Sequence, residues 1–84
     1  MQTLLKDPTI LNVLFEMASH KNTAESRQCI AMAIARLLSE EPSMVTLEQI
    51  QTIGTMMAMD NTEKGNECIA DAVSYTHLTL PTKA

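Results

Sequence analysis

The segment with the spacing of a metal-binding loop runs from Asp60 to Asp71 and reads Asp-Asn-Thr-Glu-Lys-Gly-Asn-Glu-Cys-Ile-Ala-Asp. An EF-hand loop takes an acidic residue at its first position, glycine at its sixth and an acidic residue at its twelfth, and Asp60, Gly65 and Asp71 comply. Lys64 and Glu67 depart from the pattern, because the fifth position needs an oxygen ligand and the eighth an aliphatic side chain. A degenerate EF-hand-type calcium-binding regulator using the 60–71 loop is therefore the alternative function.

Cysteine and histidine residues supply the other candidate chemistry, at Cys29, Cys68, His20 and His77. Their spacing fits no closed zinc site. Catalysis by a Cys–His pair needs a positioned base and an oxyanion hole, and no motif supplies either. We therefore expect no metal site, no cofactor and no enzymatic activity. The two cysteines are expected to be reduced, buried thiols of an intracellular protein.

The composition favours one small helical domain. The chain has 84 residues, a net charge of −4, seven methionines and only two aromatic residues, so its apolar mass is aliphatic. It has no basic stripe for nucleic acid or anionic lipid and no apolar run near the roughly 20 residues of a membrane span. We expect no nucleic-acid or membrane partner and a cytoplasmic location, with the nucleus as the alternative intracellular compartment.

Helix start and stop signals divide the chain into four helices, expected at about 8–20, 22–39, 46–59 and 62–73. Asp7-Pro8 is a helix start, since the carboxylate caps the helix and proline is tolerated at its first position. Thr46 with Gln49 has the spacing of a capping box, and Asn22-Thr23 and Asn61-Thr62 supply further caps.

Each helix carries an apolar stripe that is expected to face the core. The first helix is apolar over so much of its surface that we expect it to be sandwiched between neighbours. The predicted stripes are Ile10, Val13, Leu14, Met17 and Ala18, widened by Leu11 and Phe15; Ile30, Ala33, Ile34, Leu37 and Leu38; Leu47, Ile50, Ile53, Gly54 and Met57; and Ile69, Ala72 and Val73.

The chain also matches itself. Residues 12–34 align without a gap on residues 51–73, at a shift of 39. Seven of the 23 aligned positions are identical, namely Met17, Asn22, Thr23, Cys29, Ile30, Ala31 and Ala33 with their counterparts. A period near 40 residues is typical of helical-hairpin repeats, whose units bury their apolar faces against one another.

The run Ala31 to Leu38 (AMAIARLL) resembles the third helix of an armadillo repeat, residues 10–17 resemble its second helix, and residues 22–25 the loop between them. The glycine and the G-A-I-P-like start that armadillo repeats usually carry are absent from residues 42–50. The resemblance implies an all-α fold of two stacked helical hairpins of an armadillo/HEAT-like α-solenoid. The copies are expected at about 8–39 and 46–73, within a fragment of a repeat domain that covers residues 1–73.

By this resemblance, the protein is a non-catalytic protein–protein interaction scaffold and a fragment of a larger helical-repeat protein. Its partners are a protein or peptide and the flanking repeats of the parent chain. The family's peptide-binding Trp and Asn correspond to Met32 and Arg36, and to Asp71 and Tyr75 in the second copy. The guanidinium of Arg36 suits a carboxylate. The predicted partner-binding residues are Gln28, Met32, Arg36, Glu67 and Asp71.

The last eleven residues, Ser-Tyr-Thr-His-Leu-Thr-Leu-Pro-Thr-Lys-Ala, break the repeat after Val73. They resemble a string that recurs at the ends of translated transcriptome sequences, where it looks like read-through into adapter or vector sequence. We expect residues 74–84 to be a non-native or disordered tail, with a genuine flexible terminus as the alternative, and exclude them from functional reasoning.

Overall fold

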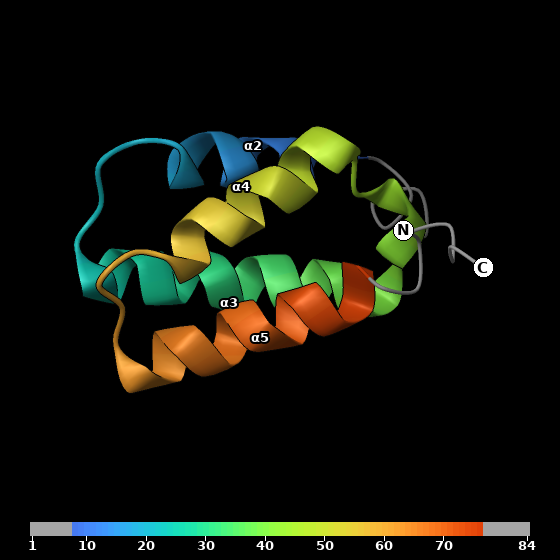
Figure 1. Cartoon of the computed structure of the whole chain (residues 1–84). Helices are drawn as coiled ribbons and strands as arrows, with labels where there is room; N and C mark the ends of the chain where they lie inside the picture. Colours follow the sequence, from blue (N-terminus) through green and yellow to red (C-terminus); the bar gives the residue numbers. More distant parts are fainter. Residues whose placement is uncertain (1–7, 77–84) are drawn as a thin grey trace.

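The computed structural model describes residues 8–76, which form four α-helices and a short 3-10 helix (Figure 1). The described residues contain no strand, so the predicted all-α class is confirmed. The expected capping residue Asp7 lies outside the described part of the chain. The elements are α2 (Thr9–Ala18), α3 (Ala24–Glu40), η1 (Pro42–Met44), α4 (Leu47–Met57) and α5 (Glu63–Thr76).

Consecutive helices run antiparallel and form two pairs (Figure 1). We call α2 with α3 the first hairpin and α4 with α5 the second hairpin. The two hairpins lie side by side, with α2 next to α4 in one layer and α3 next to α5 in the other. The contact between α3 and α5 is the most extensive between any two of these helices. This contact brings the two long second helices of the hairpins together along their length.

Three of the four predicted helix starts are present, those capped by Thr23, Thr46 and Thr62. The first differs, because Pro8 is the N-cap of α2 and not its first helical residue. The Thr23 hydroxyl oxygen accepts a hydrogen bond from the Ser26 backbone N–H at 3.0 Å. Thr46 and Gln49 form the predicted capping box, in which each side chain accepts from the other's backbone N–H, at 3.1 Å and 3.0 Å. These bonds satisfy backbone donors that the first turn of a helix leaves free. Pro42 begins η1 just after α3 ends, where the sequence predicts a break.

The turns inside the two hairpins are built alike. The Asn22 side-chain amide donates to the carbonyl oxygens of Met17 and His20, at 2.9 Å and 2.8 Å. At a shift of 39, the Asn61 amide donates to the carbonyls of Met56 and Met59, at 2.8 Å and 3.0 Å. Each asparagine thus satisfies carbonyls at the end of the preceding helix. The self-match in the sequence therefore extends to the hydrogen bonds of these turns.

The core lies between the two layers and draws on all four helices. Its largest fully buried side chains are Leu11, Ile34, Leu38, Ile53, Met56 and Ile69. In α5, Ile69 and Ala72 are buried and Val73 packs against the core, as predicted.

The predicted core stripe of α2 is wrong at three of its five positions, whereas Ala18 is buried and Leu14 packs against the core as predicted. Ile10, Val13 and Met17 are 51%, 52% and 46% exposed, whereas Leu11 and Phe15, predicted only to widen the stripe, are buried. The reason is that α2 contacts α3 and α4 on one side, and no described residue covers its other side. The expectation that α2 is sandwiched is therefore not met within residues 8–76.

The stripes of α3 and α4 are rotated from their predicted positions. Ala31 and Ala35 are buried in α3, while the predicted Ala33 and Leu37 are only half-buried. Small residues face α5 because the two helices pack closely there. In α4, Met56 is buried and Leu47 is 66% exposed, with Gly54 and Met57 also exposed, contrary to the prediction. Amphipathic period alone does not fix which flank of a broad stripe meets a neighbour.

The cysteines and the end of α5 also differ from expectation. Both thiols are free, but only Cys68 is buried, and Cys29 is exposed. Helix α5 continues to Thr76, which is 3% exposed and donates its hydroxyl hydrogen to the Val73 carbonyl at 2.7 Å. Helix α5 therefore ends three residues beyond the end predicted at Val73. Residues 77–84 lie outside the described residues, and the origin of the 74–84 segment stays a prediction.

Candidate functional site

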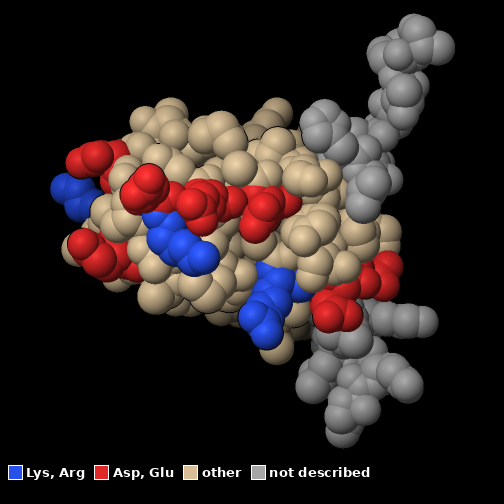
Figure 2. Space-filling model, turned by 90° about the horizontal axis from the view of Figure 1, so that it is seen from below, with Lys and Arg blue, Asp and Glu red and all other residues tan. Residues whose placement is uncertain are grey.

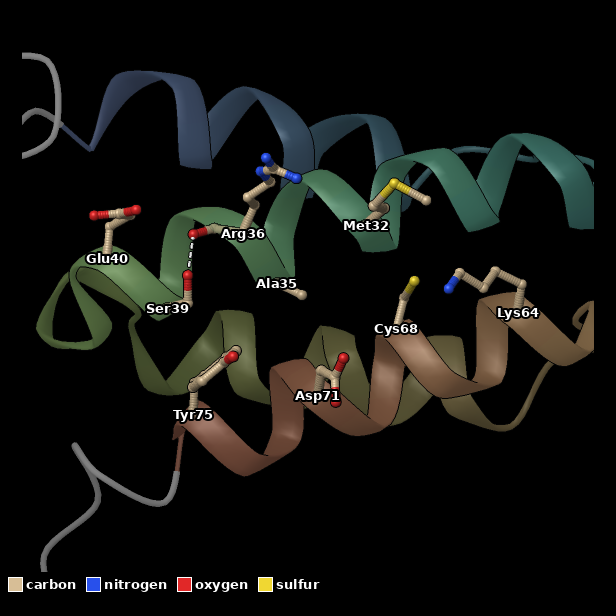
Figure 3. Close-up of a pocket in the computed structure, with 9 residues that line it drawn as sticks. All are labelled: Met32, Ala35, Arg36, Ser39, Glu40, Lys64, Cys68, Asp71 and Tyr75. Atoms are coloured by element: carbon tan, nitrogen blue, oxygen red, sulfur yellow. Dashed lines mark hydrogen bonds between the residues drawn. The ribbon is translucent and has the colours of Figure 1, made fainter.

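A shallow groove of about 530 Å³ lies between α3 and α5 (Figure 3). Helix α3 lines one wall and helix α5 the other, so both hairpins contribute to it. The lining residues are Met32, Ala35, Arg36, Ser39 and Glu40 on α3 and Lys64, Cys68, Asp71 and Tyr75 on α5.

Helical spacing explains why these residues share the groove. On α3 they begin at Met32 and recur three, four, seven and eight residues later, which places them on one face. On α5 they begin at Lys64 and recur four, seven and eleven residues later, on the face that Figure 3 shows turned toward α3. The antiparallel turn inside each hairpin is what sets α3 and α5 alongside one another. The groove is therefore a product of the hairpin pairing.

The groove carries both signs of charge. Arg36 and Lys64 provide cations, and Glu40 and Asp71 provide carboxylates. Among the described residues, the side chains of Arg36 and Asp71 have no hydrogen-bond or ion-pair partner, so both are available to a ligand. Figure 2 views the face of α3 and α5 and shows a row of acidic side chains with basic side chains beside it. Glu63 extends the acidic row that α5 presents at four-residue spacing.

Three of the five predicted partner-binding residues, Met32, Arg36 and Asp71, line this groove. The other two do not. The Gln28 side-chain oxygen accepts a hydrogen bond from the Thr62 hydroxyl at 2.6 Å, which links the two hairpins. Glu67 is exposed and lies 3.9 Å from the Lys64 ammonium, one helical turn away. Such an exposed pair adds little stability.

Arg27 is not among the predicted site residues, yet it is buried, with 6% of its surface exposed. Its guanidinium donates to the Asn61 side-chain oxygen at 2.6 Å, to the Asp60 carbonyl at 2.8 Å and to the Asn22 carbonyl at 3.1 Å. Arg27 thus joins the turn of its own hairpin to the turn of the second. The available signal was its register, because Arg27 falls three residues before Ile30, on the buried face of α3.

The calcium-binding hypothesis requires a loop over residues 60–71, and this loop does not form. Residues 63–71 are part of helix α5 instead. Before the helix, the Asp60 carbonyl and the Asn61 side-chain oxygen accept hydrogen bonds from Arg27. The Thr62 hydroxyl oxygen accepts from the Gly65 backbone N–H at 2.8 Å, which caps α5. Residues 60–71 therefore do not have the arrangement of an EF-hand ligand set.

Across residues 8–76, no cluster of three or more His, Cys, Asp or Glu side chains has an arrangement that would hold a metal ion. Across the same residues, no helix combines the length and the apolar character that a membrane crossing needs.

The fold is thus an all-helical pair of hairpins with a groove between their second helices. No protein-family model matches the sequence, and searches of curated proteins and of solved structures found no match. The armadillo/HEAT resemblance therefore rests on the residues that carry it.

Proposed function

We propose that this chain is part of a helical-repeat scaffold of the armadillo/HEAT kind, and that it binds an extended segment of a partner protein in the groove between α3 and α5. The observation that carries this proposal is the groove itself, which Met32, Arg36 and Asp71 line together. Among the described residues, the charged groups of Arg36 and Asp71 have no hydrogen-bond or ion-pair partner. An open groove between two helices that lie side by side suits an extended chain better than a compact small molecule.

The chemistry of the groove defines the segment that it would take. Arg36 offers a planar guanidinium that matches a carboxylate, and Asp71 offers a carboxylate to an amide or a cation. Met32 and the half-buried Tyr75 provide the apolar surface between them, where an aliphatic or aromatic side chain gains contact area. The expected ligand is a peptide that carries both signs of charge around an apolar anchor.

No step of catalysis is proposed for the chain. The groove contains the Cys68 thiol, but this thiol is buried and no histidine lines the groove to serve as its base. Two free thiols fit a protein of a reducing compartment, so the proposal carries an intracellular, cytoplasmic location.

Selection of a random peptide display library on the immobilised full chain tests the proposal. Selected peptides should bind in solution, and their affinity should fall at least about tenfold, or about 1.4 kcal/mol, on Arg36→Ala or Asp71→Ala. Gln51→Ala is the matched control, because Gln51 is exposed on α4 outside the groove. Failure to enrich any peptide, or equal binding by all three variants, would overturn the groove assignment.

A calorimetric titration with calcium tests the alternative function, a calcium-binding regulator that uses residues 60–71. We expect no heat of binding at micromolar calcium, since residues 63–71 are helical. Micromolar binding that Asp60→Ala abolishes would favour the calcium-binding regulator over the scaffold.

A further inference from the structure

Positions related by the shift of 39 share their local structure but differ in burial. Met56 is 2% exposed, and its counterpart Met17 is 46% exposed. Cys68 is buried and Cys29 is exposed. The same holds one turn earlier on α3 and α5, where Gly65 is buried against the backbone of α3 and its counterpart Ser26 is exposed. The second hairpin buries these positions because the first hairpin lies beside it.

On the second hairpin these positions meet the first hairpin, so their exposed counterparts mark the face of the first hairpin that points away from the second. We call it the outer face, and its apolar part on α2 is Ile10, Val13 and Met17, spaced three and four residues apart. Cys29 and Ser26 on α3 complete it. This apolar stripe is what made α2 look, in the sequence, like a helix with neighbours on two sides.

Polar groups at the outer face repeat the same pattern. Arg27 donates to the Asp60 carbonyl and to the Asn61 side-chain oxygen of the second hairpin. At a shift of 39, the corresponding acceptors on the first hairpin are the Lys21 carbonyl and the Asn22 side-chain oxygen. No described residue donates to either. The outer face thus presents two hydrogen-bond acceptors placed for an arginine side chain, and no described residue provides that arginine.

We propose that the outer face, Ile10, Val13, Met17, Ser26 and Cys29 with the Lys21–Asn22 turn, is the docking site of a preceding helical hairpin of the same build. That hairpin carries an arginine one turn into its second helix, whose guanidinium binds the Lys21 carbonyl and the Asn22 side-chain oxygen. The inference continues the interface between the two hairpins by one step in the other direction. It rests on the helical-repeat part of the proposed function and not on the groove.

The occupant follows from the residues of the existing interface. The face of the first hairpin that meets the second presents Phe15 and Arg27. The corresponding face of the second hairpin has Gly54 and Asn66 at these positions. A second copy of the whole chain, docking through its second hairpin, would therefore bring neither the aromatic ring nor the guanidinium. A flanking hairpin that resembles the first hairpin of this chain supplies both.

Lengthening the chain tests this proposal. A further copy of residues 8–46, with its own Cys29→Ala, is placed directly before residue 8, which keeps the shift of 39. A buried thiol reacts only through local opening, so alkylation of the original Cys29 by iodoacetamide should slow by about tenfold or more. Peptide mass spectrometry reads Cys29 and Cys68 separately in one sample. An unchanged Cys29 rate in a lengthened chain that circular dichroism shows to be helical would overturn the proposal.

Two matched variants of the added copy identify the contacts. Phe15→Gly and Arg27→Asn in the added copy give it the residues of the second hairpin, and together they should restore most of the Cys29 reactivity. Protection that survives both substitutions would contradict the assigned contacts. Cys29 protection that grows with concentration in the original chain, to the level of the lengthened chain, would make the occupant a second chain and overturn the flanking hairpin. Loss of peptide binding on Arg36→Ala, in the original or the lengthened chain, reports on the groove alone. The groove and the docking of a preceding hairpin are therefore tested independently.

Discussion

The two hairpins have the same turns and different surroundings. In both, an asparagine amide donates to two carbonyls of the preceding helix and a threonine hydroxyl caps the following one. Yet Met56 is buried while Met17 is exposed, and Arg27 is buried while its counterpart Asn66 is exposed. Local structure in this chain is therefore set by the repeated residues, and burial is set by which neighbour is present.

The two sides of the interface between the hairpins differ, so the pair has a direction that runs from the first hairpin to the second. The first hairpin presents an aromatic ring, small residues and a guanidinium toward the second, and the second meets it with a turn of acceptors and a glycine. An interface whose two sides differ is heterologous and can be continued in a line. Substitutions at corresponding positions measure this direction, most directly at the identical pairs Met17/Met56 and Asn22/Asn61, which differ in their neighbours.

The largest effect is expected at the methionine pair. Met56→Ala removes a fully buried side chain from the core and should lower the free energy of unfolding by about 2–5 kcal/mol. A loss of that size is a large share of the stability of so small a domain. Met17→Ala should change it by less than about 0.5 kcal/mol, because the side chain is exposed. Urea denaturation followed by circular dichroism measures both, and equal losses would mean that the hairpins are equally buried in solution.

The next effect is expected at Arg27. Arg27→Met keeps the aliphatic stem but removes three hydrogen bonds to the two turns, and should cost about 2–3 kcal/mol of unfolding free energy. Asn66→Ala, at the corresponding exposed position, should stay within about 0.5 kcal/mol of the original chain. Arg27→Lys keeps the charge without the planar fork and should recover only part of the loss. Full recovery by lysine would show that charge, and not the bridging geometry, is what matters.

The sequence was sufficient for the parts of the structure that depend on neighbours along the chain. The four helices, the Thr46–Gln49 capping box and the Asn22 and Asn61 turns follow from local signals. It was not sufficient for the faces, because both flanks of α2 are apolar and only tertiary contact decides that Leu11 is buried and Val13 exposed. Of the groove residues, Met32, Arg36 and Asp71 were predicted from the positions at which the armadillo resemblance places peptide-binding side chains.

The remaining groove residues, such as Lys64 and Glu40, could not be found from the sequence for the same reason. They line the groove because α3 packs against α5, a long-range contact that no local pattern encodes. Arg27 shows the converse case. Its register on the buried face was readable, but its partners at Asp60 and Asn61 lie more than thirty residues away in the chain and depend on the packing of the hairpins.

A smaller effect is expected at the asparagine pair. Asn22→Ala removes two donated hydrogen bonds, whereas Asn61→Ala removes two donated bonds and the one accepted from Arg27. Each such bond contributes about 0.5–1.5 kcal/mol, so Asn61→Ala should lower the unfolding free energy by about 1 kcal/mol more than Asn22→Ala. In the double variant Arg27→Met with Asn61→Ala, the two losses should not add, since the shared bond is counted once. Strict additivity would argue that Arg27 acts mainly through the backbone carbonyls.

The smallest effect separates the two glycines, which sit on opposite sides of the second hairpin. A Cβ at Gly54 meets nothing within 4 Å, so Gly54→Ala should raise the unfolding free energy by about 0.5–1 kcal/mol through helix propensity alone. A Cβ at Gly65 lies 3.0 Å from the Thr62 hydroxyl oxygen and 3.6 Å from the Gln28 Cα. That hydroxyl is held by its bonds to Gln28 and to the Gly65 N–H, so it has little room to move. Gly65→Ala should therefore not gain stability from helix propensity, and its melting temperature should fall below that of the original chain. A stabilisation equal to that of Gly54→Ala would show that the contact between α3 and α5 has room for an added methyl group.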